Sequence, residues 1–496
     1  MIALGVLEAV IDASGTAPRI EALLPAGVRP RQLAARTLLL GMMLTLADGR
    51  PAHLTRVHQA LTSLPDGQQR RLGVLADWKG GPHLLTYRQA EYTFALVTRA
   101  LGTDERGGLP SPALQAACDG LLEASIPEEF KAASRSLAVD WTDLESFSRP
   151  PPHGTSDCAD PEAAWGHRKN NLLHDEDELF FGYYLSDANM VPDEHGPPVP
   201  ELARRMTLSS CRHDPVPAFT PVLTAMPAGG IAPGDILADS GYSHRIPAHW
   251  ATPLRAAGAS LVQDLHPHDR GPKGTHAGAI IANGNLYCPA TPRTLLDLAP
   301  LSRAATPAQA AAHDAKTAEA ARYKLGRLTA DDADGYHRVA CPAVTGKTRC
   351  PLRPASMTLD RDRPEILAPP GHPQACCTQQ TLTVPADVLA KTAQKHDYPS
   401  AAWRRSYARR SGAERGFATI KDPATSDISR GWCRLMGLAP LMLFTTVLLA
   451  ARNQRILTAW DARQDENARR AARGLPPRTR KRRRKTPAAL TAAAPP

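Results

Sequence analysis

Cysteine is scarce in this chain of 496 residues, and net charge is scarce outside its C-terminal end. Nine cysteines are too few for a disulfide scaffold, and the odd number would leave one unpaired, so the sequence favours a reducing cytoplasm. Residues 463–485 hold eleven arginines and lysines against two acidic residues, which leaves the remainder with a net charge of only +1. The total charge of +10 therefore does not by itself indicate a DNA-binding body, and any basic surface there must arise from local arrangement.

Long apolar runs are also scarce. The one long run, residues 435–451, contains Gly437 and Pro440 and is at the short limit for crossing a bilayer. We expect a buried helix there and no membrane partner. The N-terminal segment carries Glu8 and Asp12 and has no basic region ahead of its apolar positions, which favours an amphipathic helix over a signal peptide. We therefore expect a cytoplasmic protein.

Residues 1–130 predict an all-helical N-terminal domain. Apolar residues recur at helical spacing through 32–46 and 53–64, and Thr86 with Gln89 has the form of a capping box at the start of a further helix. Short helices joined by tight turns suit either a helix-turn-helix reader of DNA or a plain helical support. The sequence leaves both open, because no base-reading residues can be identified.

Residues 131–269 differ in character, because short apolar runs there end in an acid. One run, from residue 137, ends at Asp140, and another, from residue 236, ends at Asp239. Strands alternating with helices predict an α/β domain. Both carboxylates would then stand at strand ends, where such sheets build their functional sites.

Residues 270–400 are rich in proline, glycine and alanine, and they predict an insertion rather than sheet. They hold five of the nine cysteines but no Cys-x-x-Cys pair, so these thiols either bind a structural Zn²⁺ or are scattered and reduced. Residues 401–461 return to a helical pattern and would complete the α/β domain. Residues 462–496 predict a basic disordered tail, which either binds DNA through its phosphates or has no partner.

Four side chains suited to phosphate chemistry share one face of the helix predicted over 401–421: Tyr407, Arg410, Glu414 and Lys421. Their spacings of three, four and seven residues place them within roughly 60° of one another. Four further arginines make the helix locally basic and able to face DNA: Arg404, Arg405, Arg409 and Arg415. The alternative is an ordinary solvated face. Together with Asp140 and Asp239, however, Glu414 would complete three carboxylates that can converge on divalent metal.

The spacing Tyr-x2-Arg-x3-Glu-x6-Lys resembles the Y-R-E-K signature of the DDE transposases of bacterial insertion sequences. The run from Asp239 to Tyr242 likewise resembles the Asp-x-x-Tyr around the second acid of that family. Asp140 is the natural candidate for the first acid, and Asp143 lies close enough to compete for that role. The resemblance covers about residues 135–265 and 401–460, and residues 1–130 gain no support from it.

The resemblance implies an α/β fold, with an RNase H-like mixed sheet flanked by helices and interrupted by the insertion. It implies that three residues are catalytic and hold two Mg²⁺ or Mn²⁺ ions: Asp140, Asp239 and Glu414. Four residues would contact DNA: Tyr407, Arg410, Lys421 and Tyr242. The expected activity is cleavage at transposon ends and transfer of the freed 3′-hydroxyl into target DNA, by a homodimer or larger assembly on double-stranded DNA in the bacterial nucleoid. The alternatives are a related RNase H-like nuclease, or a catalytically inactive DNA-binding protein such as a decayed transposase or a regulator.

Overall fold

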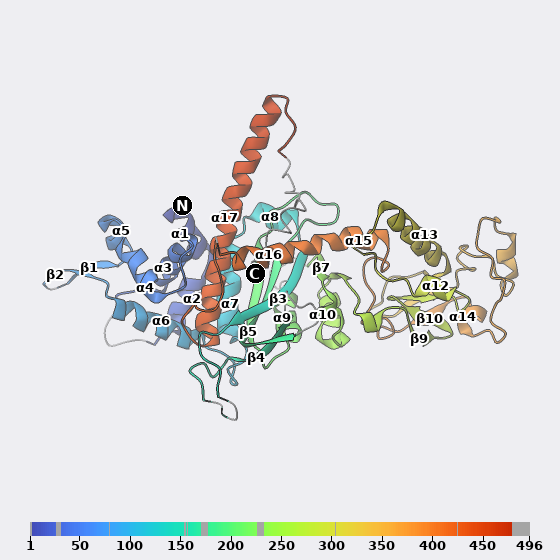
Figure 1. The fold of residues 1–496 in the computed structure, drawn as a ribbon, viewed down its shortest axis with the longest axis horizontal. Coiled ribbons are helices and arrows are strands. Elements are labelled where there is room, and N and C mark those ends of the chain that lie inside the picture. The colour runs from blue at the N-terminus through green and yellow to red at the C-terminus, as the bar shows by residue number, and fades with distance from the viewer. Residues whose placement is uncertain are drawn as a thin grey trace, which may run out of the picture.

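The structure is a computed structural model that describes residues 2–25, 31–78, 80–152, 155, 157–169, 177–225, 233–302, 304–423 and 425–478. The molecule is elongated, with the N-terminal helices at one end, a mixed sheet in the middle and the insertion at the other end (Figure 1). It is therefore a mixed α/β protein whose sheet is flanked by helices, as the sequence predicts.

The N-terminal region is helical apart from one hairpin. Its helices are α1 Leu4–Ser14, α2 Thr16–Leu23, α3 Ala35–Ala47, α4 Leu54–Thr62, α5 Asp66–Arg71, α6 Tyr87–Leu101, α7 Pro112–Ala124 and α8 Glu128–Ala133. The capping box of α6 is present, because the Thr86 side chain accepts from the Gln89 backbone and the Gln89 side chain accepts from Thr86. Strands β1 Leu75–Trp78 and β2 Gly81–Leu84 pair antiparallel, so the prediction of an all-helical domain was wrong at this hairpin.

The central sheet has six strands: β3 Leu137–Glu145, β4 Ala164–Lys169, β5 Asp177–Met190, β6 Ala203–Ser210, β7 Asp235–Ala238 and β8 Ser260–Gln263. The strand order is β4-β5-β3-β7-β8, and β6 also pairs with β5. β3 is antiparallel to β5 but parallel to β7, and β7 is parallel to β8. Because β3 and β7 run the same way, their carboxyl ends lie at the same edge of the sheet.

Helices cover this sheet from several segments of the chain: α9 Pro215–Thr224, α10 Ser240–Ser243, α11 Ala251–Ala256, α15 Ala401–Tyr407, α16 Ser411–Lys421 and α17 Leu438–Ala472. The helix expected over 401–421 is interrupted, because residues Ala408–Arg410 form a 3-10 turn, η5, between α15 and α16. α16 packs on β3 and β5. This position brings the second part of the expected catalytic domain onto the middle of the sheet.

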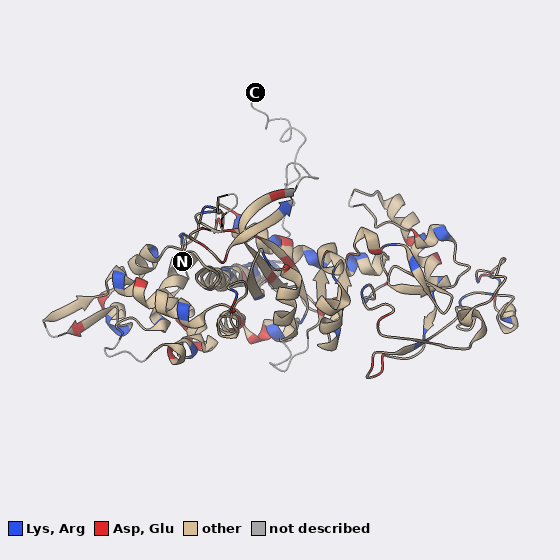
Figure 2. Ribbon diagram, turned by 90° about the horizontal axis from the view of Figure 1, so that it is seen from below, with Lys and Arg blue, Asp and Glu red and all other residues tan. Residues whose placement is uncertain are grey.

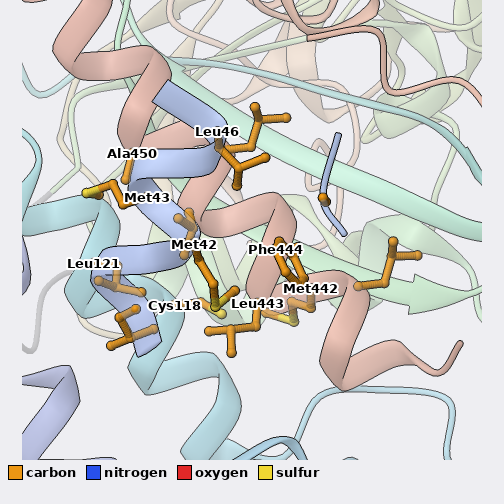
Figure 3. Close-up of a cluster of buried hydrophobic side chains, with 14 of the residues drawn as sticks. Met42, Met43, Leu46, Cys118, Leu121, Met442, Leu443, Phe444 and Ala450 are labelled. Carbon is orange, nitrogen blue, oxygen red and sulfur yellow. The ribbon is translucent and has the colours of Figure 1, made fainter. Parts of the chain in front are cut away.

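The apolar run at residues 435–451 lies mostly within α17, whose buried part joins the N-terminal helices to the sheet. Figure 3 shows Met442, Leu443 and Phe444 packed against α3 and α7 side chains that include Met42 and Leu121. Each such fully buried side chain contributes about 1.5–3 kcal/mol. Within the described residues, no helix has the length and apolarity needed to cross a membrane.

α17 also corrects the predicted start of the tail. The helix continues to Ala472, so residues 462–472, expected to be disordered, are helical, and this end projects from the body (Figure 1). The sequence here is rich in alanine and arginine, both strong helix formers. Residues 479–496, which hold most of the basic run, lie outside the described residues.

The insertion contains two small antiparallel sheets, which the prediction of a segment without sheet missed. One has the order β11-β10-β9, and the other β12-β13-β14. Their strands are β9 Pro272–His276, β10 Ala279–Ala282, β11 Asn285–Tyr287, β12 Gly326–Arg327, β13 His337–Ala340 and β14 Leu382–Val384. Three helices accompany them: α12 Arg293–Leu296, α13 Pro307–Tyr323 and α14 Ala375–Thr378. Strands this short give weak periodicity in sequence.

Candidate active site

Asp140 lies on β3, and Asp239 directly follows the neighbouring parallel strand β7. Asp140 lies within β3 rather than at its end, because the strand continues to Glu145 by pairing with the long β5. Asp239 directly follows β7 and caps α10, where its Oδ1 accepts a hydrogen bond of 2.9 Å from the Gly241 N–H. The sheet register thus brings both carboxylates to one region.

Glu414 reaches the same region because α16 lies unusually close to the sheet. A Cβ atom at Gly412 would come within 2.6 Å of the Val191 side chain, and one at Gly416 within 2.6 Å of the Asn189 amide. These glycines cost helix stability. Their lack of a side chain permits the close packing that places Glu414 over the strands.

The three acids converge on the guanidinium of Arg410. Its Nη2 lies 2.9 Å from Asp140 Oδ2 and 3.4 Å from Asp239 Oδ2, and its Nη1 lies 2.7 Å from Glu414 Oε1. Arg410 was expected to contact DNA, whereas here its charge is held by the three carboxylates. The arrangement nevertheless demonstrates that all three carboxylates reach one cation at the same time.

Access to this group of acids differs from one residue to the next. The side chain of Asp140 is 18% exposed, that of Asp239 34% and that of Glu414 44%, while Arg410 is 10% exposed. The site is therefore closed on the β3 side and open to solvent on the α16 side. A ligand would approach over Glu414.

The protonation of Asp140 reflects this crowding. Burial is the main cause that raises its pKa to about 7, and the charges of Asp239 and Glu414 raise it further, while Arg410 opposes the rise. Burial alone would lower the pKa of Arg410, but its acidic neighbours raise it overall. Three carboxylates around one position suit a cation, and their oxygen atoms are the donors that hard divalent ions prefer.

Asp143, the competitor for the first acid, has different partners. Its Oδ1 lies 2.9 Å from Lys421 Nζ, and its Oδ2 lies 2.9 Å from Arg168 Nη1. Burial raises the pKa of Asp143, but these two cations lower it overall. Asp140, not Asp143, is therefore the β3 carboxylate that joins Asp239 and Glu414 at Arg410. Lys421 is 41% exposed at the rim of the site.

The two tyrosines are positioned differently from each other. Tyr407 stacks on Trp403 with 4.8 Å between ring centroids and 14° between planes. Tyr242 is completely buried, with its ring 4.7 Å from that of Trp141 and 4.6 Å from that of Trp250. A side chain without exposed surface cannot contact DNA, so the expected DNA-binding role of Tyr242 is wrong for this conformation. It supports the floor of the site instead.

The basic surface expected along α15 and α16 is largely neutralised within the molecule. Three ion pairs account for this: Arg404 with Asp314, Arg409 with Asp235 and Arg415 with Glu201. Basic and acidic residues are also interspersed over the rest of the described chain (Figure 2). This corrects the expectation of a strongly basic, DNA-facing helix.

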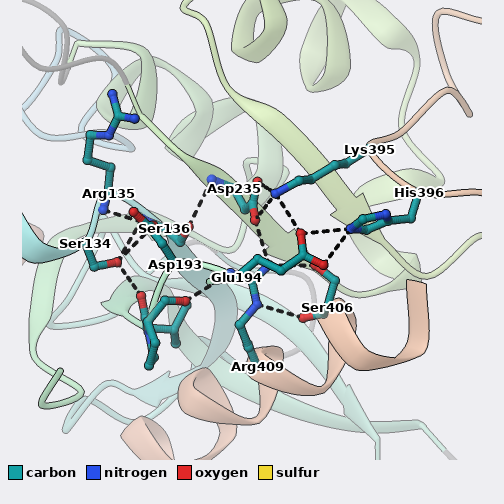
Figure 4. Close-up of polar contacts among 12 residues, drawn as sticks. Ser134, Arg135, Ser136, Asp193, Glu194, Asp235, Lys395, His396, Ser406 and Arg409 are labelled. Atoms are coloured by element: carbon teal, nitrogen blue, oxygen red, sulfur yellow. Dashed lines mark hydrogen bonds and ion pairs between the residues drawn. The ribbon is translucent and has the colours of Figure 1, made fainter. Parts of the chain in front are cut away.

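A polar network anchors the 3-10 turn that precedes Glu414. Asp235 at the start of β7 pairs with Arg409 at 2.7 Å and with Lys395 at 2.9 Å (Figure 4). Lys395 and His396 both bind Glu194, each at 2.8 Å. The network fixes Arg409 and thereby the direction of Arg410, the next residue. Because its members are far apart in the chain, the network could not be predicted from the sequence.

A second group of side chains, whose types and spacing could hold a metal ion, lies after β7 and β8 and was not predicted from the sequence. The ligand atoms of His244, His266 and Asp269 all lie within 4.8 Å of one another. Asp269 also pairs with Lys391 at 2.8 Å. These residues could hold a metal ion, and the run His-Pro-His-Asp at 266–269 was the sequence signal that could have found them.

Comparison with known proteins adds no further assignment: the chain matches no protein-family model and no curated protein.

Proposed function

We propose that this chain is a DDE transposase with an RNase H-like catalytic core, acting on double-stranded DNA in the bacterial cytoplasm. The observation that carries the proposal is the convergence of Asp140, Asp239 and Glu414 on the single cation of Arg410. Two further features support it. The acids come from neighbouring parallel strands and a helix, and an insertion separates Asp239 from Glu414 in sequence.

In this proposal Asp140, Asp239 and Glu414 hold two Mg²⁺ or Mn²⁺ ions. When bound, such a pair of ions neutralises charge on the attacking and leaving oxygens of a phosphodiester. Glu414 is on the open side, where DNA enters. Arg410 would exchange its carboxylate partners for a phosphate of the DNA, which its planar guanidinium can bind through two hydrogen bonds.

The reaction has two displacements at phosphorus. In the first, water attacks the phosphate at the transposon end, the bond to the 3′-oxygen breaks, and a 3′-hydroxyl and a 5′-phosphate result. In the second, that 3′-hydroxyl attacks a target phosphodiester and releases a target 3′-hydroxyl. Lys421, at the rim, would attract the backbone, and Tyr407 would lie beside the strand end. Joining two ends requires a dimer or larger assembly.

A second candidate is a DNA-binding protein without catalysis. The observation that favours it is that Arg410 pairs with all three carboxylates, so that a side chain of the protein stands where a metal ion would be held. A related nuclease is a third reading, which differs only in lacking the joining step. Activity distinguishes the three candidates.

The test is strand cleavage and joining on duplex DNA that carries the inverted repeats flanking the gene, with Mg²⁺ or Mn²⁺. We expect the wild type to nick at the repeat boundary and to join the end to target DNA. Asp239→Asn and Glu414→Gln should abolish both steps while DNA affinity persists. Glu201→Gln is the matched control, since Glu201 pairs with Arg415 on the outer face of the same helix.

Binding without cleavage by the wild type would favour the non-catalytic candidate. Cleavage without joining would favour the nuclease, and cleavage retained in Asp239→Asn and Glu414→Gln would refute the assignment of the site.

A further inference from the structure

Two histidines and an aspartate from different loops meet at one edge of the central sheet. β7 and β8 are parallel neighbours, so the segments that follow them leave the sheet at the same edge. His244 directly follows α10, the short helix after β7, and His266 and Asp269 belong to the turn after β8. The ligand atoms of these three side chains all lie within 4.8 Å of one another. The sheet topology therefore gathers three side chains of types that bind metal ions.

Backbone hydrogen bonds hold the two loops in this arrangement. The His266 N–H donates to Oγ of Ser243, the residue before His244, at 3.1 Å. The Asp269 N–H donates to the His266 carbonyl at 2.8 Å and closes a 3-10 turn, η3 Pro267–Asp269. Residues three apart in such a turn lie on the same side of it. The proximity of the three side chains thus follows from the backbone that carries them.

The two histidine rings are arranged as a pair of metal ligands. Their centroids lie 4.0 Å apart. His266 Nδ1 accepts a hydrogen bond of 3.3 Å from the His268 N–H, so this nitrogen carries a lone pair rather than a proton. Neutral imidazole is the form that binds metals, whereas two protonated rings at this separation would repel each other.

The carboxylate of Asp269 is held in place by a lysine. Lys391 Nζ lies 2.9 Å from Oδ1 and 2.8 Å from Oδ2 of Asp269, whose side chain is 15% exposed. Each carboxylate oxygen has two lone pairs, so this ion pair leaves acceptor capacity for a metal ion. The Lys391 side chain is 30% exposed and can turn toward solvent when an ion takes one of these oxygens.

We propose that His244, His266 and Asp269 bind one Zn²⁺ ion. Two imidazoles and one carboxylate favour a borderline transition-metal ion over Mg²⁺, which prefers oxygen ligands. Ligand atoms bonded to one tetrahedral Zn²⁺ at about 2.0–2.1 Å lie about 3.3 Å apart. From separations within 4.8 Å, movements of no more than about 1.5 Å bring each pair of ligand atoms to that spacing.

This ion differs from the pair proposed at Asp140, Asp239 and Glu414. Its ligands come from the loops after β7 and β8 and include nitrogen. Three protein ligands leave a fourth position for water, on the side where His244 is exposed. The ion would join the two loops while staying accessible to solvent. The inference is independent of the proposed transposase function.

Two residues provide matched controls. His268 is an exposed histidine of the same turn, but its ring centroid lies 6.3 Å from that of His244 and it is outside the set of three. Glu414→Gln removes a carboxylate from the group around Arg410, so it separates binding at that group from binding at the histidines.

The test is titration of the full chain, freed of metal by a chelator, with Co²⁺ as a spectroscopic substitute for Zn²⁺. We expect one equivalent to give the visible bands of a four- or five-coordinate site without the thiolate bands that cysteine ligands cause, and Zn²⁺ to abolish them. His244→Ala, His266→Ala and Asp269→Asn should each weaken binding more than about 100-fold, since loss of a residue that merely orients a ligand already costs about 10–100-fold. His268→Ala and Glu414→Gln should bind like the wild type.

A measurement on the wild type covers the case in which a variant fails to fold. Zn²⁺ should protect His244 and His266 from modification by diethyl pyrocarbonate, located by mass spectrometry of peptides. The exposed His249, which is outside the set of three, should stay reactive.

The absence of visible bands from the wild type, or the presence of thiolate bands, would overturn the proposal. Loss of binding in Glu414→Gln would place the ion at the carboxylates around Arg410 instead, and a loss in His268→Ala as large as that in His266→Ala would refute the ligand set. Equal modification of His244 with and without Zn²⁺ would also overturn it.

Discussion

Replacement of Arg410 by glutamine separates the two roles of the cation at the site. In the wild type this guanidinium pairs with Asp140, Asp239 and Glu414, whereas in Arg410→Gln the three carboxylates face one another without it. We expect the variant to be less stable in the absence of divalent ions. We also expect Mn²⁺ to stabilise it more than the wild type, because the ion no longer competes with the guanidinium.

The size of the expected loss of stability follows from how exposed each carboxylate partner of Arg410 is. The contact with Asp140 is mostly buried, and loss of one partner from a buried pair costs about 3–5 kcal/mol. Asp239 and Glu414 are a third or more exposed, so each of their pairs adds only about 0.2–1 kcal/mol. We therefore expect a loss of about 5 kcal/mol. Mn²⁺ at one hundred times its dissociation constant restores about 2.7 kcal/mol.

The assay is thermal and urea unfolding with and without Mn²⁺. The control is Arg415→Gln, which removes the ion pair between this residue of the same helix and Glu201. It should cost no more than about 1 kcal/mol and should not change the response to Mn²⁺. Equal stability of the two variants without metal, or equal gains from Mn²⁺ in Arg410→Gln and the wild type, would show that Arg410 does not occupy the position of a metal ion.

Three further predictions concern the surroundings of the site. Gly416→Ala forces a Cβ atom to within 2.6 Å of the Asn189 amide and should lower the free energy of unfolding by about 1–3 kcal/mol, measured by thermal unfolding. The control is Gly5→Ala, at a helical position with nothing within 4 Å, which should be neutral or slightly stabilising. Equal effects of the two substitutions would show that α16 is not closely packed at Gly416. Lys421→Ala should weaken DNA binding and reduce the slope of log affinity against log salt by about one, measured by fluorescence anisotropy, and an unchanged slope would remove Lys421 from the DNA contacts. Although burial raises the pKa of Glu194, its lysine and histidine partners lower it to about 2 from 4.5, so its stabilising contribution is complete above pH 4.5 and lost as pH falls toward 2. In Glu194→Gln the unfolding midpoint should therefore fall less steeply over this range, and a parallel fall would count against the network.

Much of the geometry of the candidate site could be predicted from sequence, because the strand and the helix that position its residues show recognisable patterns over short stretches of the chain. An apolar run followed by an acid predicted where Asp239 lies, and helical spacing predicted the relation of Arg410 to Glu414. The extent of β3 beyond Asp140 could not be predicted, because it depends on pairing with the distant β5. The same holds for the choice between Asp140 and Asp143, which rests on tertiary partners.

Other features depend on tertiary contacts that leave little trace in sequence. The spacing of Tyr242 from Asp239 in sequence does not indicate whether its side chain faces DNA or the core. Its burial follows from the packing of Trp141 and Trp250 against it. The hairpin in the N-terminal region did have a local signal, since Gly80, between the strands, and Gly81, at the start of β2, both have positive φ. The role of Gly412 and Gly416 depends on the packing of α16 against Val191 and Asn189, which are distant in sequence.

The most direct measurement compares Asp140→Asn with Asp143→Asn in Mg²⁺-dependent cleavage of the flanking-repeat DNA. Both carboxylates lie on β3, but only Asp140 joins Asp239 and Glu414 at a common cation, while Asp143 pairs with Lys421 and Arg168. We predict that Asp140→Asn binds the DNA and does not cut it, whereas Asp143→Asn still cuts. Cleavage by Asp140→Asn, or loss of cleavage only in Asp143→Asn, would show that Asp140 is not the first catalytic acid.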